Sequence, residues 1–249
     1  VRSMVLNATP FITTQHFNGT YLIEPIPYNP PDTSFHAGQH LNISTDDAWE
    51  NSPIQFPFTF VFFGEKYTQA VVGSNGIVSF NTGQNGKPNV VGQHCCYAYN
   101  VPIPTTNFET ASSSDNSKNA IYGIYEDIDP AYLRSNNGTC GMFRQVGGEY
   151  PCRYLSASVN GVDQFGNHNN YNTYQIVCYE GTNIIEVHVK ERNCCSTTNG
   201  GKGLIGIMNH TGQTQVSTKN NPSYDENTGL PAFTNYIEPN SPGAFVAPN

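Results

Sequence analysis

Residues 56–81 have the sequence FPFTFVFFGEKYTQAVVGSNGIVSFN, and this stretch decides the fold. Its first segment has phenylalanine at every second position, so an extended chain places four rings on one face (Phe56, Phe58, Phe60 and Phe62). The segments Gly64-Glu65-Lys66 and Ser74-Asn75-Gly76 provide turns, because glycine and asparagine tolerate positive φ. The stretch therefore predicts a meander of three strands, at 56–62, 67–72 and 77–80, with one apolar face buried.

The same pattern of short strands and turns continues toward the C-terminus. We expect further strands at 120–125, 142–146, 153–159, 174–179, 183–190 and 203–208. The segment 161–172 is so rich in Asn and Gly that we expect a loop there. No segment has the sustained 3.6-residue periodicity of a helix. We therefore predict a single all-β domain over residues 1–249, a jelly-roll-like β-sandwich with long irregular loops and extended, proline-rich flanks at 1–35 and 216–249.

Composition points to a secreted or cell-surface protein. Charged residues make up only 12% of the 249 residues, which is about half the usual share. The net charge is -8 and there is no basic run, so nucleic acid is excluded as a partner. No apolar run approaches the roughly 20 residues of a membrane-spanning helix. The first residues, VRSMVLNATPF, lack the pattern of a signal peptide and an initiating Met, and we expect a processed protein or a piece of a longer one.

The cysteines predict disulfides. There are seven, including two adjacent pairs (Cys95, Cys96, Cys140, Cys152, Cys178, Cys194 and Cys195). Adjacent cysteines on a strand point to opposite faces, so each pair could bond to two different partners. We expect a disulfide framework, with one thiol free or bonded outside the chain because the number is odd. A zinc site is the weaker alternative, because there is no CxxC motif and His94 is the only histidine beside a pair.

An acidic cluster at 126–129 is the candidate metal site. Asp127 and Asp129 project to the same side of an extended chain, and Glu126 precedes them. Together with the Asp46-Asp47 pair or a backbone carbonyl, they could bind Ca²⁺, which prefers several oxygen ligands. The simpler alternative is a strand end closed by turn-forming aspartates before Pro130.

Aromatic and amide side chains in the expected loops are the candidate ligand site. Aromatic faces stack on sugar rings and Asn side chains bond to hydroxyls, which selects five residues (Tyr97, Tyr99, Asn169, Asn170 and Tyr171). The alternative is that these tyrosine rings are buried with the hydroxyl at the rim.

No enzyme is predicted. Glu126 and Glu186 could form a glycosidase pair, but nothing in the sequence fixes their separation, and there is no GxSxG motif. His188 lies on the polar face of a strand, and we interpret it as a solvated or cross-strand residue.

Five sequence motifs in a fixed order resemble a known family. They are FPFTFVFFGEKYTQAVVGSNGIVSFNT, NAIYGIYEDIDP, YPCRYLSASVNGV, YQIVCYEGTNIIEVHVKERNCC and GKGLIGIMNHTG. Over residues 40–215 the chain resembles a module of large Bacteroidetes surface proteins, which include gliding-motility-type adhesins exported by the type IX secretion system. The meander at 56–81 is also similar to the nidogen-type extracellular domain. The resemblance implies export, a β-rich fold and a place in a long multidomain surface protein, and it implies no catalytic residues.

Three functions fit these features. The first is a non-enzymatic adhesin or cell-surface module that mediates adhesion or assembly by binding a glycan, a protein or copies of itself. The second is a carbohydrate-binding ancillary domain of a secreted hydrolase. The third is a structural subunit of an extracellular filament, in which the first 35 residues or the tail add to the sheet edge of a neighbour.

The chain also has five Asn-x-Ser/Thr sequons (Asn7, Asn18, Asn42, Asn137 and Asn209). In a eukaryotic secreted protein these would be glycan acceptors. In a bacterial protein they would be by-products of a composition rich in Asn and Thr.

Overall fold

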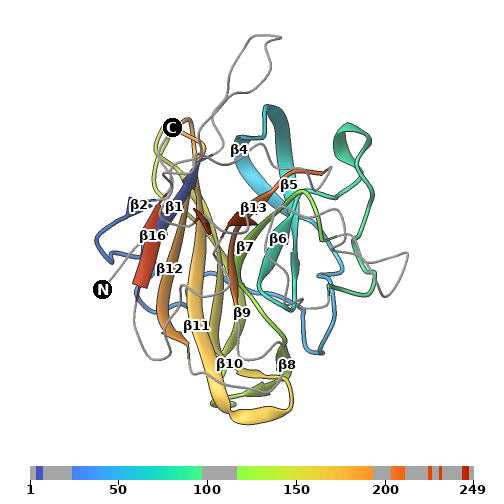
Figure 1. Cartoon of the computed structure of the whole chain (residues 1–249), viewed down its shortest axis with the longest axis vertical. Helices are drawn as coiled ribbons and strands as arrows, with labels where there is room; N and C mark the ends of the chain where they lie inside the picture. The colour runs from blue at the N-terminus through green and yellow to red at the C-terminus, as the bar shows by residue number, and fades with distance from the viewer. Residues whose placement is uncertain are drawn as a thin grey trace.

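The computed structural model describes residues 4–7, 24–96, 117–192, 203–210, 224–225, 230–231 and 243–246. A nine-stranded and a five-stranded antiparallel sheet form the two layers of a β-sandwich, as predicted (Figure 1). A separate pair of short strands, β14 and β15 (Tyr224–Asp225 and Leu230–Pro231), completes the described strands. None of the described residues forms a helix that is long and apolar enough to span a membrane.

The phenylalanine meander supplies three strands of the smaller sheet. This sheet has the order β13-β7-β6-β5-β4 (Leu204–Met208, Ala120–Tyr125, Ile77–Ser79, Glu65–Gly73 and Ile54–Phe62). The larger sheet has the order β1-β2-β16-β12-β11-β10-β9-β3 (Met4–Asn7, Glu24–Pro25, Gly243–Val246, Ile184–Arg192, Asn167–Tyr179, Tyr154–Gln164, Gly141–Gly147 and Gln39–His40). Strand β8 (Ile128–Leu133) lies off this path and pairs with β10. A single 3-10 turn, η1 (Gln84–Gly86), follows β6 within the described chain.

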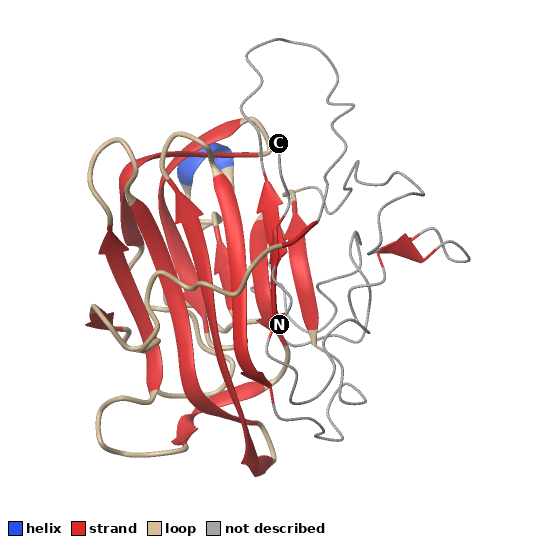
Figure 2. Cartoon of the chain, turned by 90° about the vertical axis from the view of Figure 1, so that its left-hand side faces the viewer, coloured by secondary structure: helices blue, strands red, loops and turns tan. Residues whose placement is uncertain are grey.

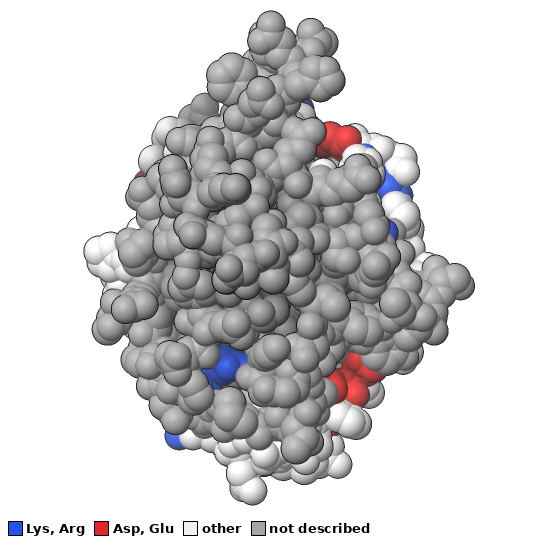
Figure 3. All heavy atoms as spheres, viewed as in Figure 1, with Lys and Arg blue, Asp and Glu red and all other residues white. Residues whose placement is uncertain are grey.

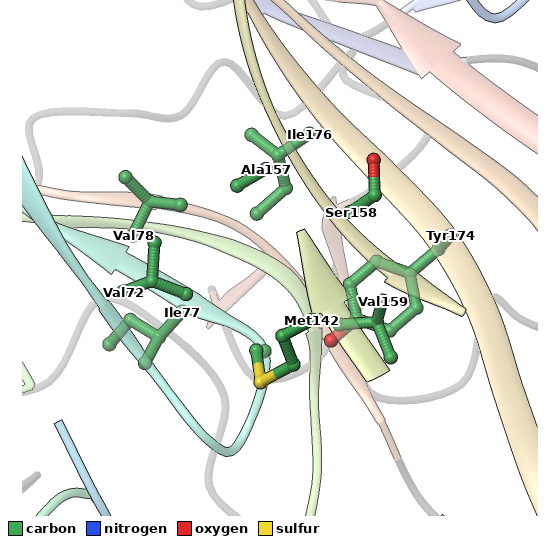
Figure 4. A pocket seen from close by; sticks show the side chains of 10 residues that line it. Val72, Ile77, Val78, Met142, Ala157, Ser158, Val159, Tyr174 and Ile176 are labelled. Carbon is green, nitrogen blue, oxygen red and sulfur yellow. The ribbon is translucent and has the colours of Figure 1, made fainter. Parts of the chain in front are cut away.

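The core lies between the two sheets. All four phenylalanines of β4 are buried, as the alternation predicts. The ring of Phe80 packs against those of Phe60 and Phe62, with centroids 5.8 and 4.4 Å away. Figure 4 shows side chains of β5 and β6 facing those of β9, β10 and β11, and the cavity between them has a volume of only about 10 Å³. This volume holds at most about one water molecule, so no ligand fits between the ten residues that line this cavity.

The expectation of a loop at 161–172 is wrong. Strand β10 continues to Gln164 and β11 begins at Asn167, so only Phe165 and Gly166 form the turn between them. The register shifts after Asn160, where Gly161 has a φ of 59° and the hairpin bends. Asn-rich sequence is tolerated here because the strands pair through backbone groups, which every residue other than proline provides.

Residues 26–38 cross the outer face of the larger sheet, where Figure 2 shows a loop running over the long strands. The backbone N–H of Asp32 donates to Gln175 Oε1 at 3.4 Å, and the Lys190 ammonium lies 5.4 Å from the Phe35 ring. The interpretation of His188 as a solvated residue is wrong, because this segment leaves only 1% of it exposed. Its Nε2 instead lies 2.8 Å from Glu186 Oε2.

Three short strands of the two flanks join the larger sheet of the same chain, whereas β14 and β15 of the C-terminal flank pair with each other. Strand β1 pairs with β12, with Val5 opposite Glu186. Strand β16 also pairs with β12, and β2 pairs with both β1 and β16. These flank strands therefore extend their own sheet.

One disulfide bond joins two of the described cysteines. Cys95 and Cys96 are bonded to each other, so the expectation that this pair serves two different partners is wrong. The backbone there is irregular rather than extended strand, and the two side chains therefore do not diverge. Cys140, Cys152 and Cys178 are free thiols, and burial raises the pKa of the Cys178 thiol. Cys194 and Cys195 lie outside the described residues.

The core packing gives a direct prediction. Phe60→Ala is expected to lower the free energy of unfolding by about 3–5 kcal/mol, because it removes a fully buried ring and leaves a cavity. Thr59→Ala, on the exposed side of the same strand, is expected to change it by less than about 0.5 kcal/mol. Urea denaturation followed by circular dichroism measures both values. A loss below about 1 kcal/mol for Phe60→Ala would contradict this packing.

Candidate metal centre

Three aspartates that are distant in sequence meet at one corner of the sandwich. Asp46 and Asp47 lie in the loop between β3 and β4, and Asp127 lies at the bend between β7 and β8. One carboxylate oxygen from each residue lies within 4.8 Å of the other two. Acidic side chains gather at the lower right of Figure 3, in the region where the loop before β4 runs in Figure 1. The sequence suggested this combination, and the structure brings the three carboxylates together.

The Ser74-Asn75-Gly76 turn holds these two segments in place. The Asn75 side chain is fully buried, and its Nδ2 donates to Asp47 Oδ1 at 3.0 Å and to the Cys96 carbonyl at 2.5 Å. Its Oδ1 accepts from the backbone N–H of Ile128 at 3.1 Å. One amide therefore connects the aspartate loop, the bonded cysteines and the bend that carries Asp127.

The neighbours of Asn75 fix the turn itself. The Ser74 backbone N–H donates to the Ala48 carbonyl at 2.8 Å, and the Ala48 N–H donates to Ser74 Oγ at 3.0 Å. Gly76 has a φ of 80°, and a Cβ there would overlap the Tyr174 hydroxyl and the Ile124 carbonyl. Only glycine fits this close approach of the turn to the larger sheet.

The electrostatics of the corner are unfavourable without a cation. Burial raises the pKa of Asp127 to about 7, with further contributions from the charges of Asp46, Asp47, Asp129 and Glu126. The pKa of Asp46 is also raised, first by burial and then by the charge of Asp129. Every charged group that shifts Asp127 is thus another carboxylate. Hard oxygen ligands of this kind are what Ca²⁺ prefers.

Two of the predicted ligands are bonded elsewhere. Glu126 is buried and accepts from Arg192, with Oε2 lying 2.7 Å from Nη2 and 3.1 Å from Nε. Asp129 Oδ1 accepts the backbone N–H of Ala131 at 2.9 Å. Among the described residues, the group that could hold a metal ion consists of Asp46, Asp47 and Asp127.

The predicted ligand site is only partly within the described residues. Tyr97 and Tyr99 lie outside them. Asn169, Asn170 and Tyr171 lie on β11, and the Arg134 guanidinium covers the Tyr171 ring at 4.2 Å.

The β10–β11 hairpin and the neighbouring strand β8 carry exposed aromatic residues that sequence reasoning missed. Tyr132 on β8 is 47% exposed and stacks on His168 of β11 with centroids 3.6 Å apart, and Phe165 at the hairpin tip is 45% exposed. The Phe165 N–H donates to the Asp127 carbonyl at 3.0 Å, so this tip adjoins the acidic corner. Phe165 stands directly before Gly166, and this placement in the sequence could have indicated an aromatic residue at an exposed turn.

The two glutamates considered as a glycosidase pair have separate partners. Glu126 binds Arg192, whereas Glu186 Oε2 accepts from the Tyr179 hydroxyl at 2.7 Å and contacts His188 on the outer face of the larger sheet. These partners give each carboxylate a role in holding the fold.

A polar hollow of about 350 Å³ opens beside the aspartates. Its walls come from the two short segments 42–51 and 92–94, and Asp46 and Asp47 belong to both the hollow and the acidic corner. Sequence reasoning missed this hollow, because ordinary loop residues form it and only the fold places the two segments together.

Comparison with known proteins identifies a relationship at the level of a family. A family model described as NIDO related matches residues 27–243, which include every strand of the smaller sheet and six of the nine strands of the larger sheet. No curated protein and no solved structure matches the chain. A nidogen-related domain is compatible with an extracellular location.

The raised carboxyl pKa values predict how stability depends on pH. The pKa is about 7 for Asp127 and about 6 for Asp163 in the folded state, against about 3.9 in an unfolded chain. The folded state therefore binds more protons than the unfolded state between about pH 4 and 7, and the free energy of unfolding falls as pH rises through this range. The free energy of unfolding of the wild type should therefore be lower at pH 7.5 than at pH 5. In buffer with chelator, Asp127→Asn should make this decrease smaller by about 1 kcal/mol, a value discounted for the partial exposure of Asp127.

Urea denaturation at the two pH values tests this prediction. Glu149→Gln, which removes an exposed carboxylate, is the matched control and should keep the wild-type dependence on pH. Equal losses for Asp127→Asn and the wild type would show that Asp127 is ionised at pH 5 in the folded state.

The buried amide gives a second prediction for this corner. Asn75→Ala removes three hydrogen bonds and leaves their buried partners unsatisfied, so it should destabilise the protein by about 3 kcal/mol. Asn136→Ala, at an exposed position, should have an effect below about 0.5 kcal/mol. Thermal and urea denaturation measure both, and near-equal stabilities of the two variants would refute the connecting role of Asn75.

Proposed function

We propose, because this chain belongs to the NIDO-related family, that it is a non-enzymatic module of an extracellular or cell-surface protein and mediates adhesion through one calcium-stabilised corner of its sandwich. The observation that carries this proposal is the meeting of Asp46, Asp47 and Asp127 within 4.8 Å. These residues come from two loops on separate parts of the chain, and a bound cation would relieve the repulsion between their carboxylates.

Calcium is the cation that fits this corner. The three carboxylates provide hard oxygen atoms, and backbone carbonyls and water supply the rest of its six to eight ligands. Mg²⁺ requires a stricter octahedral arrangement of shorter bonds, whereas Ca²⁺ accepts the irregular geometry that side chains from two separate loops provide. Extracellular modules bind calcium with modest affinity, so a site with three acidic ligands suits that environment.

Bound calcium would fix the surface that surrounds it. Asp127 is in contact with the Phe165 tip through its carbonyl, and Asp47 is in contact with the bonded cysteines through its own carbonyl, which accepts the Cys95 N–H at 2.7 Å. Holding the two aspartate loops together therefore orders the exposed hairpin tip on one side and the polar hollow on the other. A preordered surface binds a partner at a lower entropic cost.

The resemblance to adhesins of Bacteroidetes surface proteins agrees with this proposal, and type IX export remains a prediction from that resemblance. Assembly into a filament by strand addition is less favoured, because the described strands of both flanks pair within their own chain. A carbohydrate-binding ancillary domain would use the same corner, so this alternative differs only in what the full-length protein carries.

Calcium titration tests the metal centre. Millimolar calcium should raise the melting temperature of the wild type by several degrees, since a ligand that binds only the folded state stabilises it. Asp127→Asn should remove most of this increase, because it replaces a charged ligand with a neutral one. Glu149→Gln should keep the full increase, which excludes a general effect of net charge.

Differential scanning calorimetry in calcium and in chelator provides the measurement. An identical melting temperature of the wild type in both buffers would refute the calcium centre. An increase that Asp127→Asn retains in full would place the ion elsewhere.

A further inference from the structure

The polar hollow beside the acidic corner has the features of a built binding site. It has a volume of about 350 Å³, which is at the lower end of the range for small-molecule sites. Side-chain amides, hydroxyls and carboxylates provide most of its lining (Asn42, Ser44, Thr45, Asp46, Asp47, Asn51 and Gln93), together with the imidazole of His94. A hollow of this character offers hydrogen bonds in several directions and little apolar surface.

Hydrogen bonds from the buried residue Glu50 hold the rim of the hollow in place. Its side chain is buried, and its two carboxylate oxygens accept the backbone N–H groups of Asn42 at 2.7 Å and Asn51 at 3.0 Å. The Glu50 carbonyl accepts the N–H of Gly92 at 3.3 Å, and its own N–H donates to Val72 of β5 at 2.8 Å. One buried residue thus ties three points of the rim to the core, so the rim is positioned before any ligand arrives.

The groups on the rim retain unused hydrogen-bonding capacity. Within the described part of the chain, the side-chain amides of Asn42 and Asn51 make no hydrogen bond. Trp49 also lines the hollow, and its buried indole Nε1–H has no acceptor among the described residues. An amide donates and accepts, as a sugar hydroxyl does, whereas an unpaired indole N–H favours an oxygen-rich occupant.

We propose that this hollow binds an oligosaccharide, whose hydroxyl groups bond to the side-chain amides of Asn42 and Asn51 and complete the coordination of a calcium ion held by Asp46, Asp47 and Asp127. This inference rests on the calcium centre proposed above and names the ligand of that corner. Asp46 and Asp47 lie on the shared wall, so an ion bound there would face the hollow.

Other classes of ligand fit this hollow less well. A protein partner would be expected to meet exposed aromatic or arginine anchors, whereas the described lining has no arginine and its one tryptophan, Trp49, is buried. Nucleic acid is excluded by the carboxylates on the wall and by the net charge of -8. A saccharide supplies neutral hydroxyls that can bond to the amides of Asn42 and Asn51 and also coordinate a cation, so it suits both parts of this wall.

Screening the full chain on an immobilised oligosaccharide array, in calcium and in chelator, tests the inference. The protein should be produced in a host without N-glycosylation, since Asn42 belongs to a sequon and a glycan there would cover the hollow. We expect binding to at least one saccharide in calcium. Isothermal titration with that saccharide in soluble form should show an affinity about tenfold lower for the double variant Asn42→Ala/Asn51→Ala, because two hydrogen bonds are lost.

The matched control is Asn136→Ala, which removes an exposed amide outside the lining of the hollow. It should bind the saccharide as the wild type does. An unchanged melting temperature of both variants confirms that the fold is intact, as the free amides at Asn42 and Asn51 predict.

Two outcomes would overturn the inference. The first is the absence of saccharide binding by a protein whose melting temperature calcium raises, which refutes the hollow as a glycan site and leaves the calcium centre standing. The second is binding that the Asn42→Ala/Asn51→Ala variant retains in full. Binding that persists in chelator but is lost in this variant would support the hollow and refute the role of calcium in it.

Discussion

The buried amide of Asn75 is the interaction on which the acidic corner depends. A polar side chain without access to water must have its donors and acceptors satisfied, and the three partners of Asn75 come from three separate segments. Satisfying this one side chain therefore brings together the loop of Asp47, the bonded cysteines and the bend that carries Asp127. The phenylalanine meander at 56–81 positions this amide, because Asn75 belongs to its second turn. The stretch that forms the core thus also positions the candidate site.

The corner combines firm support with unfavourable charge. Hydrogen bonds from backbone and amide groups hold the loops closely, while the carboxylates they carry repel one another in a half-buried setting. Natural proteins tolerate such conflicts mainly where a ligand or proton relieves them. Glu126 provides a contrast, because its buried carboxylate is paired with the Arg192 guanidinium.

The larger sheet is buried on its inner face and on part of its outer face, which explains its mixed composition. Its inner face packs on the smaller sheet, while residues 26–38 cover part of its outer face and account for the burial of His188. The polar side chains of that face are buried in hydrogen-bonded pairs, such as Gln175 with Ser158 at 2.8 Å. A pattern of alternating polar residues therefore marks the outer face of a strand without showing whether water reaches it.

The sequence by itself determined the fold class, most strand positions and the acidic residues of interest. Alternating phenylalanines and Asn-Gly turns act over a few residues, so their consequences follow from local geometry alone. Tertiary structure decided which aspartates meet, that Cys95 bonds to Cys96, that 161–172 is paired strand and that Glu50 builds the rim of a hollow. These outcomes depend on long-range packing and backbone pairing, which place distant loops side by side and leave no periodic trace in the sequence.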